Sequence, residues 1–294
     1  MTDNGKLKIL FIINPVSGTA NKSWEEIINN YFREKPFEVC LFFIPKESNI
    51  DAIKEKIRTF QPKKIVAVGG DGTVTMVAKL VAESKLTLGI VPAGSANGMA
   101  KELNIPENPI EALNIITSGH IQCCDAIKIN DKDVCLHLSD IGLNAQLIKY
   151  FDEGKMRGKI GYAKVILKTL WHKQKMEVTL LVKNQEIRRN AFMVVLANAS
   201  KYGTGAVINP LGQLDDGAFE VVIVRRLALS EFIKMIFRPQ PFNPSKIETF
   251  SATSIKLETV RSVHFQIDGE YMGKIKNLQA QILPDYINIV LPGI

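Results

Sequence analysis

The chain has 294 residues, more than one hydrophobic core usually fills, so we expect two domains. Hydrophobic residues make up 46% of it and charged residues 23%, which is typical of a globular protein, and no apolar run approaches the ~18 residues that a membrane span needs. The net charge of +7 favours an anionic partner, which leaves open a nucleotide, a nucleic acid or an acidic membrane surface.

The cysteines and histidines argue against a disulfide framework and against a zinc site. The four histidines are scattered without an H-x-x-x-H pair, and the N-terminal residues lack the layout of a signal peptide. The four cysteines form no C-x-x-C pair; they are Cys40, Cys123, Cys124 and Cys135. We therefore expect reduced thiols and a cytoplasmic protein.

Strand-like apolar runs alternate with helical patterns over the first part of the chain, which is typical of βαβ units and a parallel sheet. The expected strands cover residues 7–15, 37–45, 63–70 and 86–92. The expected helices cover residues 22–35, 50–60, 74–84, 97–105 and 109–119. Gly119 is the predicted C′ residue at which the last of these helices ends.

Short apolar runs separated by turn residues follow from residue 121 onward and predict antiparallel strands in a β-sandwich. These strands are expected within residues 123–130, 133–143, 176–184, 190–199, 217–226, 254–260, 262–270 and 286–292. Two helical patterns, at 158–175 and 228–238, interrupt them. The expected organisation is thus an α/β domain of residues 1–124 and an all-β domain of residues 125–294.

Three glycine-rich turns follow strands of the α/β domain. They read NPVSGTA at 14–20, GGDGT at 69–73 and PAGSANG at 92–98. Because the carboxyl ends of parallel strands meet at one edge of the sheet, we expect these turns to lie together. Glycine lets the backbone approach a phosphate closely, and the N–H groups of a helix N-terminus favour an anion. One such turn is often only a tight connection, but three at one edge predict a phosphate-binding site.

Asp71 lies inside the second of these turns. A carboxylate beside a phosphate is unfavourable unless a cation lies between them or the carboxylate accepts a proton. Asp71 is therefore interpreted as a magnesium ligand or as the base that deprotonates an attacking hydroxyl. The alternative is an N-cap for the helix that begins near residue 73. The chain has no P-loop motif, no G-x-G-x-x-G in its first turn and no G-x-S-x-G, which disfavours a P-loop NTPase, a dinucleotide dehydrogenase and a hydrolase.

The motifs NPVSG, GGDGT and PAGSAN, in this order, resemble the diacylglycerol kinase catalytic-domain family, which includes bacterial lipid kinases and the sphingosine and ceramide kinases. Residues 198–224 are similar to the G-G-x-x-x-x-P…DG…D-V segment of that family, and FQIDGEY at 265–271 is similar to its D-G-E motif. The resemblance implies a Rossmann-like nucleotide-binding domain, a β-sandwich domain and an active site in the cleft between them. GGDG also occurs in NAD kinases and phosphofructokinases, so it does not decide by itself.

The resemblance also implies roles for individual residues. Asp71 and Glu270 would be catalytic, with Glu270 as the base or its partner, and Asp268 would contribute to the nucleotide site. Asp216 would help to hold a structural divalent cation, although a turn before Gly217 explains it equally well. The remaining nucleotide-binding residues come from the three turns; they are Asn14, Ser17, Gly18, Gly69, Gly70, Gly72, Thr73, Gly94, Ser95 and Asn97.

The third turn departs from the family pattern at one position. Many bacterial diacylglycerol kinases read G-T-x-N-D there, with an acid that helps to place magnesium, whereas this chain has Gly98. Sphingosine-type relatives also lack the acid, so the identity of the lipid stays open. We expect a glycine to be required at position 98, either for positive φ or for close approach of substrate.

Taken together, these motifs predict a kinase that transfers the γ-phosphoryl group of ATP, with Mg²⁺, to the hydroxyl of diacylglycerol or of a sphingoid-like lipid. Two alternatives stay open: an NAD kinase-like enzyme that acts on a soluble hydroxyl, and a nucleotide-sensing protein without turnover. Nucleic-acid binding is not expected, because no basic motif lined by aromatic residues occurs. A homodimer remains an open possibility.

Two segments have the composition of a surface that docks on an anionic membrane. Residues 157–175 alternate apolar residues with basic ones such as Lys164 and Lys168, as in an interfacial helix. A surface helix with a solvated basic face has the same composition. The segment 235–245 adds prolines together with Phe237 and Phe242, which are expected to be exposed. We therefore expect peripheral association with a membrane that carries the lipid substrate.

Overall fold

The computed structural model describes residues 6–17, 23–45, 50–153, 174–183, 185–202, 206–237 and 241–293. The chain forms two compact units, one of residues 1–124 with 285–294 and the other of residues 125–284. The sequence analysis assigned 285–294 to the second domain, and this part of the assignment is wrong. The reason is strand pairing, because Asn288 and Ile289 pair with the fourth strand of the first unit.

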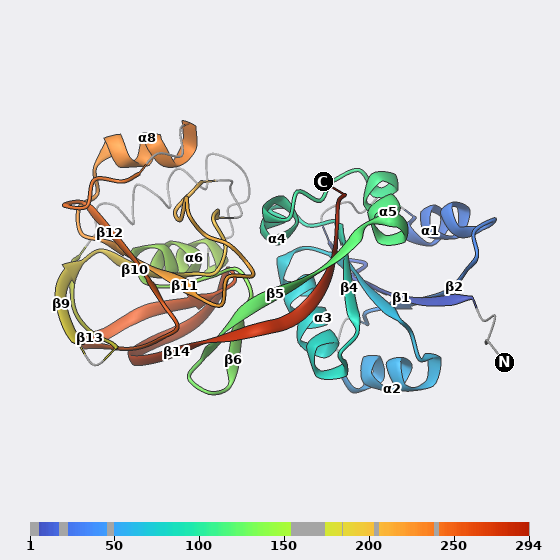
Figure 1. The fold of residues 1–294 in the computed structure, drawn as a ribbon, viewed down its shortest axis with the longest axis horizontal. Helices are drawn as coiled ribbons and strands as arrows, with labels where there is room; N and C mark the ends of the chain where they lie inside the picture. Colours follow the sequence, from blue (N-terminus) through green and yellow to red (C-terminus); the bar gives the residue numbers. More distant parts are fainter. Residues whose placement is uncertain are drawn as a thin grey trace. The chain divides into compact units, whose positions relative to one another are not determined.

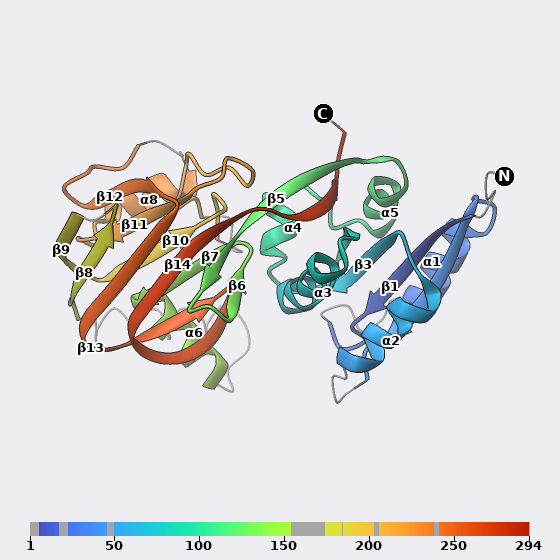
Figure 2. The same cartoon turned by 60° about the horizontal axis from the view of Figure 1, so that its bottom comes forward.

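The first unit is a parallel sheet covered by helices. Its elements are β1 (Leu7–Ile13), α1 (Trp24–Phe32), β2 (Phe37–Phe43), α2 (Ile50–Phe60), β3 (Lys64–Gly69), α3 (Asp71–Ser84), β4 (Thr87–Pro92), α4 (Gly98–Glu102) and α5 (Pro109–Ser118). The strands follow the order β2-β1-β3-β4, with the end of β14 beside β4, and all of these pairs are parallel. Figures 1 and 2 show α1 and α5 over one face of this sheet and α2 and α3 over the other.

The sequence explains why these elements form where they do. Five consecutive residues of β1, Ile9 to Ile13, are fully buried, as expected for a strand with helices on both faces. Helix α1 begins after Ser23, whose hydroxyl accepts a hydrogen bond from the Glu26 N–H at 3.3 Å. Helix α5 begins in the same way after Asn108, with a proline in its first turn.

Gly119 ends α5, as the sequence predicted, but the reason is different. Its φ is −69°, so it does not adopt the left-handed C′ conformation. A Cβ atom at this position would lie 2.3 Å from the carbonyl oxygen of Leu291 and 2.6 Å from that of Ile115. Glycine is therefore required because the C-terminal strand passes close to the end of the helix.

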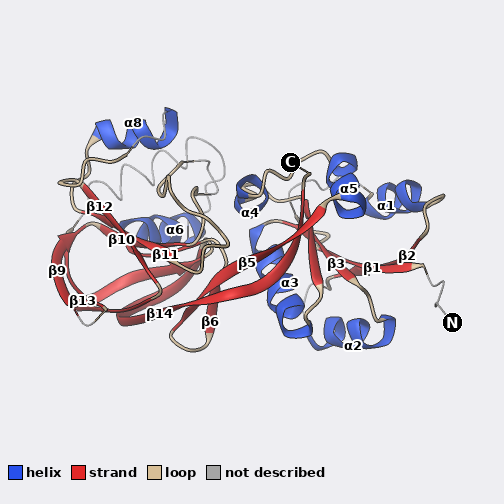
Figure 3. Ribbon diagram, in the orientation of Figure 1, coloured by secondary structure: helices blue, strands red, loops and turns tan. Residues whose placement is uncertain are grey.

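The second unit consists mostly of antiparallel strands, as the red ribbons of Figure 3 show, and confirms the expected β-sandwich class. Its main path is β12-β11-β10-β7-β13-β14, and β8 and β9 extend from β13. The elements are β5 (His120–Ile129), β6 (Asp133–Cys135), β7 (Leu138–Gly142), α6 (Leu143–Glu153), β8 (Met176–Val182), β9 (Gln185–Ala191), β10 (Met193–Ala197), β11 (Phe219–Val224), α8 (Leu229–Phe237), β12 (Ile247–Ala252), β13 (Ser254–Ile267) and β14 (Glu270–Leu291).

Several details of the second unit differ from the sequence analysis. Strand β12 and most of β9 lie where no strand was expected, and the run expected at 133–143 forms two strands, β6 and β7. The runs expected as separate strands at 254–260 and 262–270 form one long strand, β13, with register shifts along its pairing to β14. Helix α6 was not expected. It begins after β7 because the carboxylate of Asp140 accepts a hydrogen bond from the Ala145 N–H at 2.9 Å and so satisfies the first turn.

Candidate active site

The strand order of the first unit creates a binding position at one edge of its sheet. Strand β1 lies between β2 and β3, so the order of the strands reverses between β1 and β3. In open parallel sheets, ligands bind beyond the carboxyl ends of the strands at such a reversal. Asn14 directly follows β1, and Gly70 directly follows β3. The two turns that the sequence selected thus begin where the topology predicts a ligand.

A cavity of about 470 Å³ lies at this edge and is lined by all three glycine-rich turns. The lining residues are Asn14, Val16, Ser17, Ile44, Gly70, Gly72, Thr73, Met76, Gly94 and Ser95. The sequence analysis selected seven of them and missed the apolar residues Val16, Ile44 and Met76. Their apolar side chains form an apolar part of the cavity lining. A signal existed for Met76, which follows Thr73 at the i, i+3 spacing of one helix face.

Asn14 joins the first turn to the second. Its Nδ2 donates a hydrogen bond to Oγ1 of Thr73 at 3.2 Å, and its Oδ1 accepts one from the Val16 N–H at 3.1 Å. The hydroxyl of Ser17 donates to the carbonyl oxygen of Asn14 at 2.8 Å and closes the turn. Gly18, which the sequence also placed here, lies outside the described residues.

Gly70 and Gly94 bring the second and third turns into direct contact. A Cβ atom built on Gly94 would lie 2.4 Å from the Cα atom of Gly70. Gly69 is equally confined, because its Cβ would lie 2.4 Å from Oγ1 of Thr73. Glycine is therefore needed at 70 and 94 for the contact between the two backbones, and at 69 for the contact with the Thr73 side chain, in addition to any approach of a ligand.

Asp71 connects the second turn to the third. Its Oδ2 accepts a hydrogen bond from the Gly98 N–H at 3.0 Å, and its Oδ1 accepts one from the Met99 N–H at 3.1 Å. Asp71 is thus a capping residue, as the alternative interpretation held, but it caps α4 and not its own helix. The N-cap of α3 is Gly70, which has no side chain to offer.

The backbone conformations of Asn97 and Gly98 differ from one of the two alternatives expected above, that position 98 has a positive φ. The positive φ of +52° belongs to Asn97, and Gly98 is the buried first residue of α4 with no positive φ. The Asn97 amide closes the turn, since its Oδ1 accepts from the Gly94 N–H at 2.8 Å and its Nδ2 donates to the Gly94 carbonyl at 3.0 Å. The amide is occupied in this way, so the carboxylate of Asp71 takes over the cap of α4.

Asp268 has a structural position in the second unit. It occupies the tight turn between β13 and β14 at φ +49°, as a hairpin predicts. Its carboxylate accepts hydrogen bonds from the N–H groups of Leu136 and His137, both at 2.9 Å, and of Leu138 at 3.3 Å. It also accepts one from the Cys135 thiol at 3.2 Å. Burial raises the pKa of this thiol well above its usual value, which keeps it a donor. The contacts of Asp268 therefore hold the chain before β7 in place.

Glu270 follows that turn and is exposed at the start of β14. A series of buried, hydrogen-bonded polar side chains holds this turn in place. The Gln266 Oε1 accepts a hydrogen bond from the Gly269 N–H at 2.8 Å, and its Nε2 donates to Oδ2 of Asp140 at 2.6 Å. Burial raises the pKa of Asp140 to about 6, and hydrogen bonds from Asn144 and Gln266 limit the shift. The sequence analysis had no signal for this support, because its members are far apart in the chain.

Asp216 lies in an exposed turn. Its Oδ1 accepts a hydrogen bond from the Ala218 N–H at 3.1 Å, and Gly217 has a φ of +71°. The Gly217 N–H donates to Oδ2 of the buried Asp125 at 2.7 Å. These contacts agree with the turn interpretation, and the role in cation binding stays a prediction.

The donor set near the glycine-rich turns does not form a magnesium cage. Mg²⁺ takes carboxylate and phosphate oxygens at short distances. The residues that line the cavity include no acid, and both oxygen atoms of Asp71 face N–H groups of α4. Within the described residues, no three His, Cys, Asp or Glu side chains are grouped as a metal site requires. The residues that line this cavity therefore do not by themselves supply the ligands of a magnesium ion.

The segments expected at a membrane are only partly described. Residues 154–173, which contain Lys164 and Lys168, lie outside the described residues, as does the side chain of Phe237. Phe242 was expected to be exposed, but it is partly buried and packs on a core cluster around Val222. None of the helices in the described residues combines the length and the hydropathy that a bilayer span requires.

Comparison with known proteins supports the resemblance along both units. Residues 8–129 match the family model of the diacylglycerol kinase catalytic domain, and residues 139–291 match that of the YegS C-terminal NAD kinase beta sandwich-like domain. A probable lipid kinase YegS-like of Chromohalobacter salexigens is 28% identical over 78% of this chain and 76% of its own length. A diacylglycerol kinase of Staphylococcus saprophyticus is 24% identical over 90% of this chain and 89% of its own.

A solved structure has the same fold. The crystal structure of a diacylglycerol kinase from Bacillus anthracis superposes with a TM-score of 0.75 at 20% identity and covers 97% of this chain and 96% of its own. The two family models together span most of the chain, and the relatives match over three quarters or more of their own length. The shared fold agrees with this assignment. The chain therefore belongs to the family of diacylglycerol kinases and YegS-like lipid kinases.

Proposed function

We propose that this kinase transfers the terminal phosphoryl group of ATP to the hydroxyl group of a lipid. The observation that carries the proposal is the convergence of three glycine-rich turns on one cavity at the reversal of the strand order. Backbone N–H groups and the hydroxyls of Thr73 and Ser95 are suited to phosphate oxygens there. The apolar side chains of Val16, Ile44 and Met76 are suited to the base of the nucleotide.

The transfer itself requires alignment, charge neutralisation and a proton acceptor. The lipid hydroxyl oxygen forms a bond to the γ-phosphorus, the bond from that phosphorus to the β–γ bridging oxygen breaks, and the hydroxyl proton passes to a carboxylate. We assign the proton acceptor to Glu270, because its side chain is exposed whereas that of Asp268 is engaged by three N–H groups and a thiol. We assign Asp71 to positioning, because its two oxygen atoms hold the N-terminus of α4.

An assay with radiolabelled ATP tests the proposal. The purified protein is incubated with a panel of lipids in mixed micelles, which includes diacylglycerol and a sphingoid base, and with NAD as the soluble acceptor. Incorporation of label into a lipid, and not into NAD, is the expected result. Label in NAD alone would establish the soluble-hydroxyl alternative, and nucleotide binding without label in any acceptor would support a sensor without turnover.

A further inference from the structure

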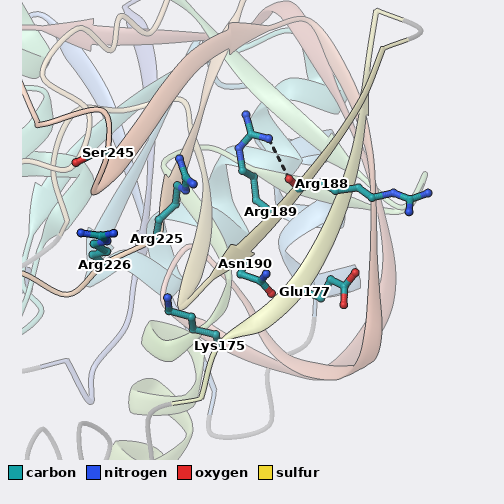
Figure 4. Close-up of a pocket in the computed structure, with 8 residues that line it drawn as sticks. All are labelled: Lys175, Glu177, Arg188, Arg189, Asn190, Arg225, Arg226 and Ser245. Carbon is teal, nitrogen blue, oxygen red and sulfur yellow. Dashed lines mark hydrogen bonds between the residues drawn. The ribbon is translucent and has the colours of Figure 1, made fainter.

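The second unit contains a cavity that the proposed phosphoryl transfer does not use. Its volume is about 410 Å³, and its lining comes from the β8–β9 pair, the end of β11 and the segment before β12. The lining residues, shown in Figure 4, are Lys175, Glu177, Arg188, Arg189, Asn190, Arg225, Arg226 and Ser245. Five of these eight side chains are cations and one is an acid. We call this the basic cavity.

Nearby acids neutralise only part of this charge. Glu248 accepts hydrogen bonds from Nε and Nη2 of Arg189 at 2.7 and 2.8 Å and lies 3.8 Å from Arg225. The Arg189 hydrogen bonds lower the pKa of Glu248, so it is ionised at neutral pH. Glu186 pairs with Arg188. With Glu177, three carboxylates thus accompany five cations, which leaves two positive charges in excess among the described residues of this region.

Hydrogen bonds fix the main chain that carries two of the cations. The N–H groups of Arg225 and Arg226 donate to the same carbonyl oxygen, that of Lys246, at 2.8 and 3.1 Å. The ammonium group of Lys175 lies 5.4 Å from the centre of the Phe192 ring. In Figure 4 the head groups of Arg225, Arg226 and Lys175 lie on one side of the ribbon that carries Asn190. A main chain that is already ordered at Arg225 and Arg226 does not have to be ordered on binding, which lowers the entropic cost.

We propose that the basic cavity binds the phosphate group of an anionic ligand. Guanidinium groups present two parallel N–H donors that match the oxygen atoms of a phosphate. Ser245 and Asn190 add neutral donors to the lining. The excess of two charges equals that of a phosphomonoester dianion, whereas a carboxylate would leave one cation unmatched. This chemistry is the same for a soluble phosphate and for a lipid head group, so the test has an arm for each.

The test compares a cavity variant with a control of equal charge. The cavity variant combines Lys175→Gln with Arg226→Gln. The control combines Lys256→Gln with Arg261→Gln, which removes one lysine and one arginine from exposed positions of β13 in the same unit. Binding of inorganic pyrophosphate is measured by calorimetry, and binding to phosphatidylcholine vesicles that contain phosphatidic acid is measured by sedimentation.

For at least one of the two probes, we expect the control to bind as tightly as the parent. The cavity variant should bind that probe about tenfold more weakly, which is the scale of one lost charge-assisted hydrogen bond. An effect on pyrophosphate identifies a soluble ligand, and an effect on vesicles alone identifies a lipid head group. Pyrophosphate that binds the glycine-rich turns contributes equally to both variants and cancels in the comparison. Equal binding of both probes by the two variants would overturn the proposal. If the double variant fails to fold, Arg226→Gln alone serves in its place, paired with Arg261→Gln.

Discussion

At the scale of single residues, the site depends on which groups donate hydrogen bonds to each carboxylate. Asp71 and Asp268 are both engaged with backbone N–H groups, while Glu270 is exposed. The two aspartates thus hold backbone segments in position, whereas Glu270 is the carboxylate that we propose as the proton acceptor. Sequence motifs identify such residues together, but they do not separate these roles.

The positioning role of Asp71 is tested by Asp71→Asn. An amide has a single oxygen atom, so either Gly98 or Met99 loses its acceptor, which should cost about 1–2 kcal/mol of unfolding free energy. The third turn would also shift, and a misplacement of this kind lowers turnover by on the order of a hundredfold. Both quantities are measured, by denaturant titration and by the lipid kinase assay. Asp51→Asn, an equal change in the first turn of α2, is the control and should leave both close to the parent. A folded Asp71→Asn protein with parental turnover would contradict this role.

Asp140 makes a prediction about pH. Its pKa in the folded protein is about 6, against an ordinary value of 3.8. Between these values the folded protein binds more protons than the unfolded chain, so the free energy of unfolding falls as the pH rises through this window. Asp140→Asn removes this titration. We expect the parent to lose on the order of 3 kcal/mol relative to the variant over that range.

Urea titrations of both proteins at several pH values measure the difference. Asp131→Asn, at an exposed aspartate of the same unit, should follow the parent across the whole range. Curves for the parent and Asp140→Asn that stay parallel would show that Asp140 does not titrate in this window.

At the scale of elements, the cavity of the first unit depends on contact between the turns that follow β3 and β4. Gly94→Ala tests this contact, because the new Cβ would lie 2.4 Å from the Cα atom of Gly70 and must push the turns apart. Overpacking of this kind costs about 1–3 kcal/mol. We expect a folded protein whose KM for ATP rises at least about tenfold, the equivalent of 1.4 kcal/mol.

Gly293→Ala is the matched control, since a Cβ at Gly293 meets nothing within 4 Å. It should leave the KM for ATP unchanged. An unchanged KM in Gly94→Ala would mean that the phosphate site does not need these two turns in contact.

At the scale of the whole molecule, the chain leaves the first unit and returns to it through β14. Ile289 is fully buried in the first unit, while Ile282 on the same strand belongs to the core of the second. Substitution of either by alanine should cost about 2–5 kcal/mol. We expect Ile289→Ala to increase amide hydrogen exchange in β3 and β4, and Ile282→Ala to increase it in β13. Loss of protection in the same strands in both variants would show that the two units unfold together.

The sequence by itself determined the class of the fold, the positions of the three turns and the family. These follow from local signals: buried apolar runs define β1, β3 and β4, and glycine-rich motifs end those strands. Seven residues selected from these turns line one cavity. Their selection needed no long-range information, because the carboxyl ends of parallel strands meet at one edge of the sheet.

Only the tertiary structure decided which atoms those residues meet. It showed that Asp71 caps α4, that Gly119 makes room for Leu291, and that residues 285–294 return to the first unit. It also showed that Asp140 and Gln266 are hydrogen-bonded to each other and that Gln266 holds the turn before Glu270. The basic cavity was likewise visible only in the tertiary structure. Each of these contacts joins segments that are distant along the chain, and their meeting depends on strand pairing and packing, which no local pattern of residues encodes.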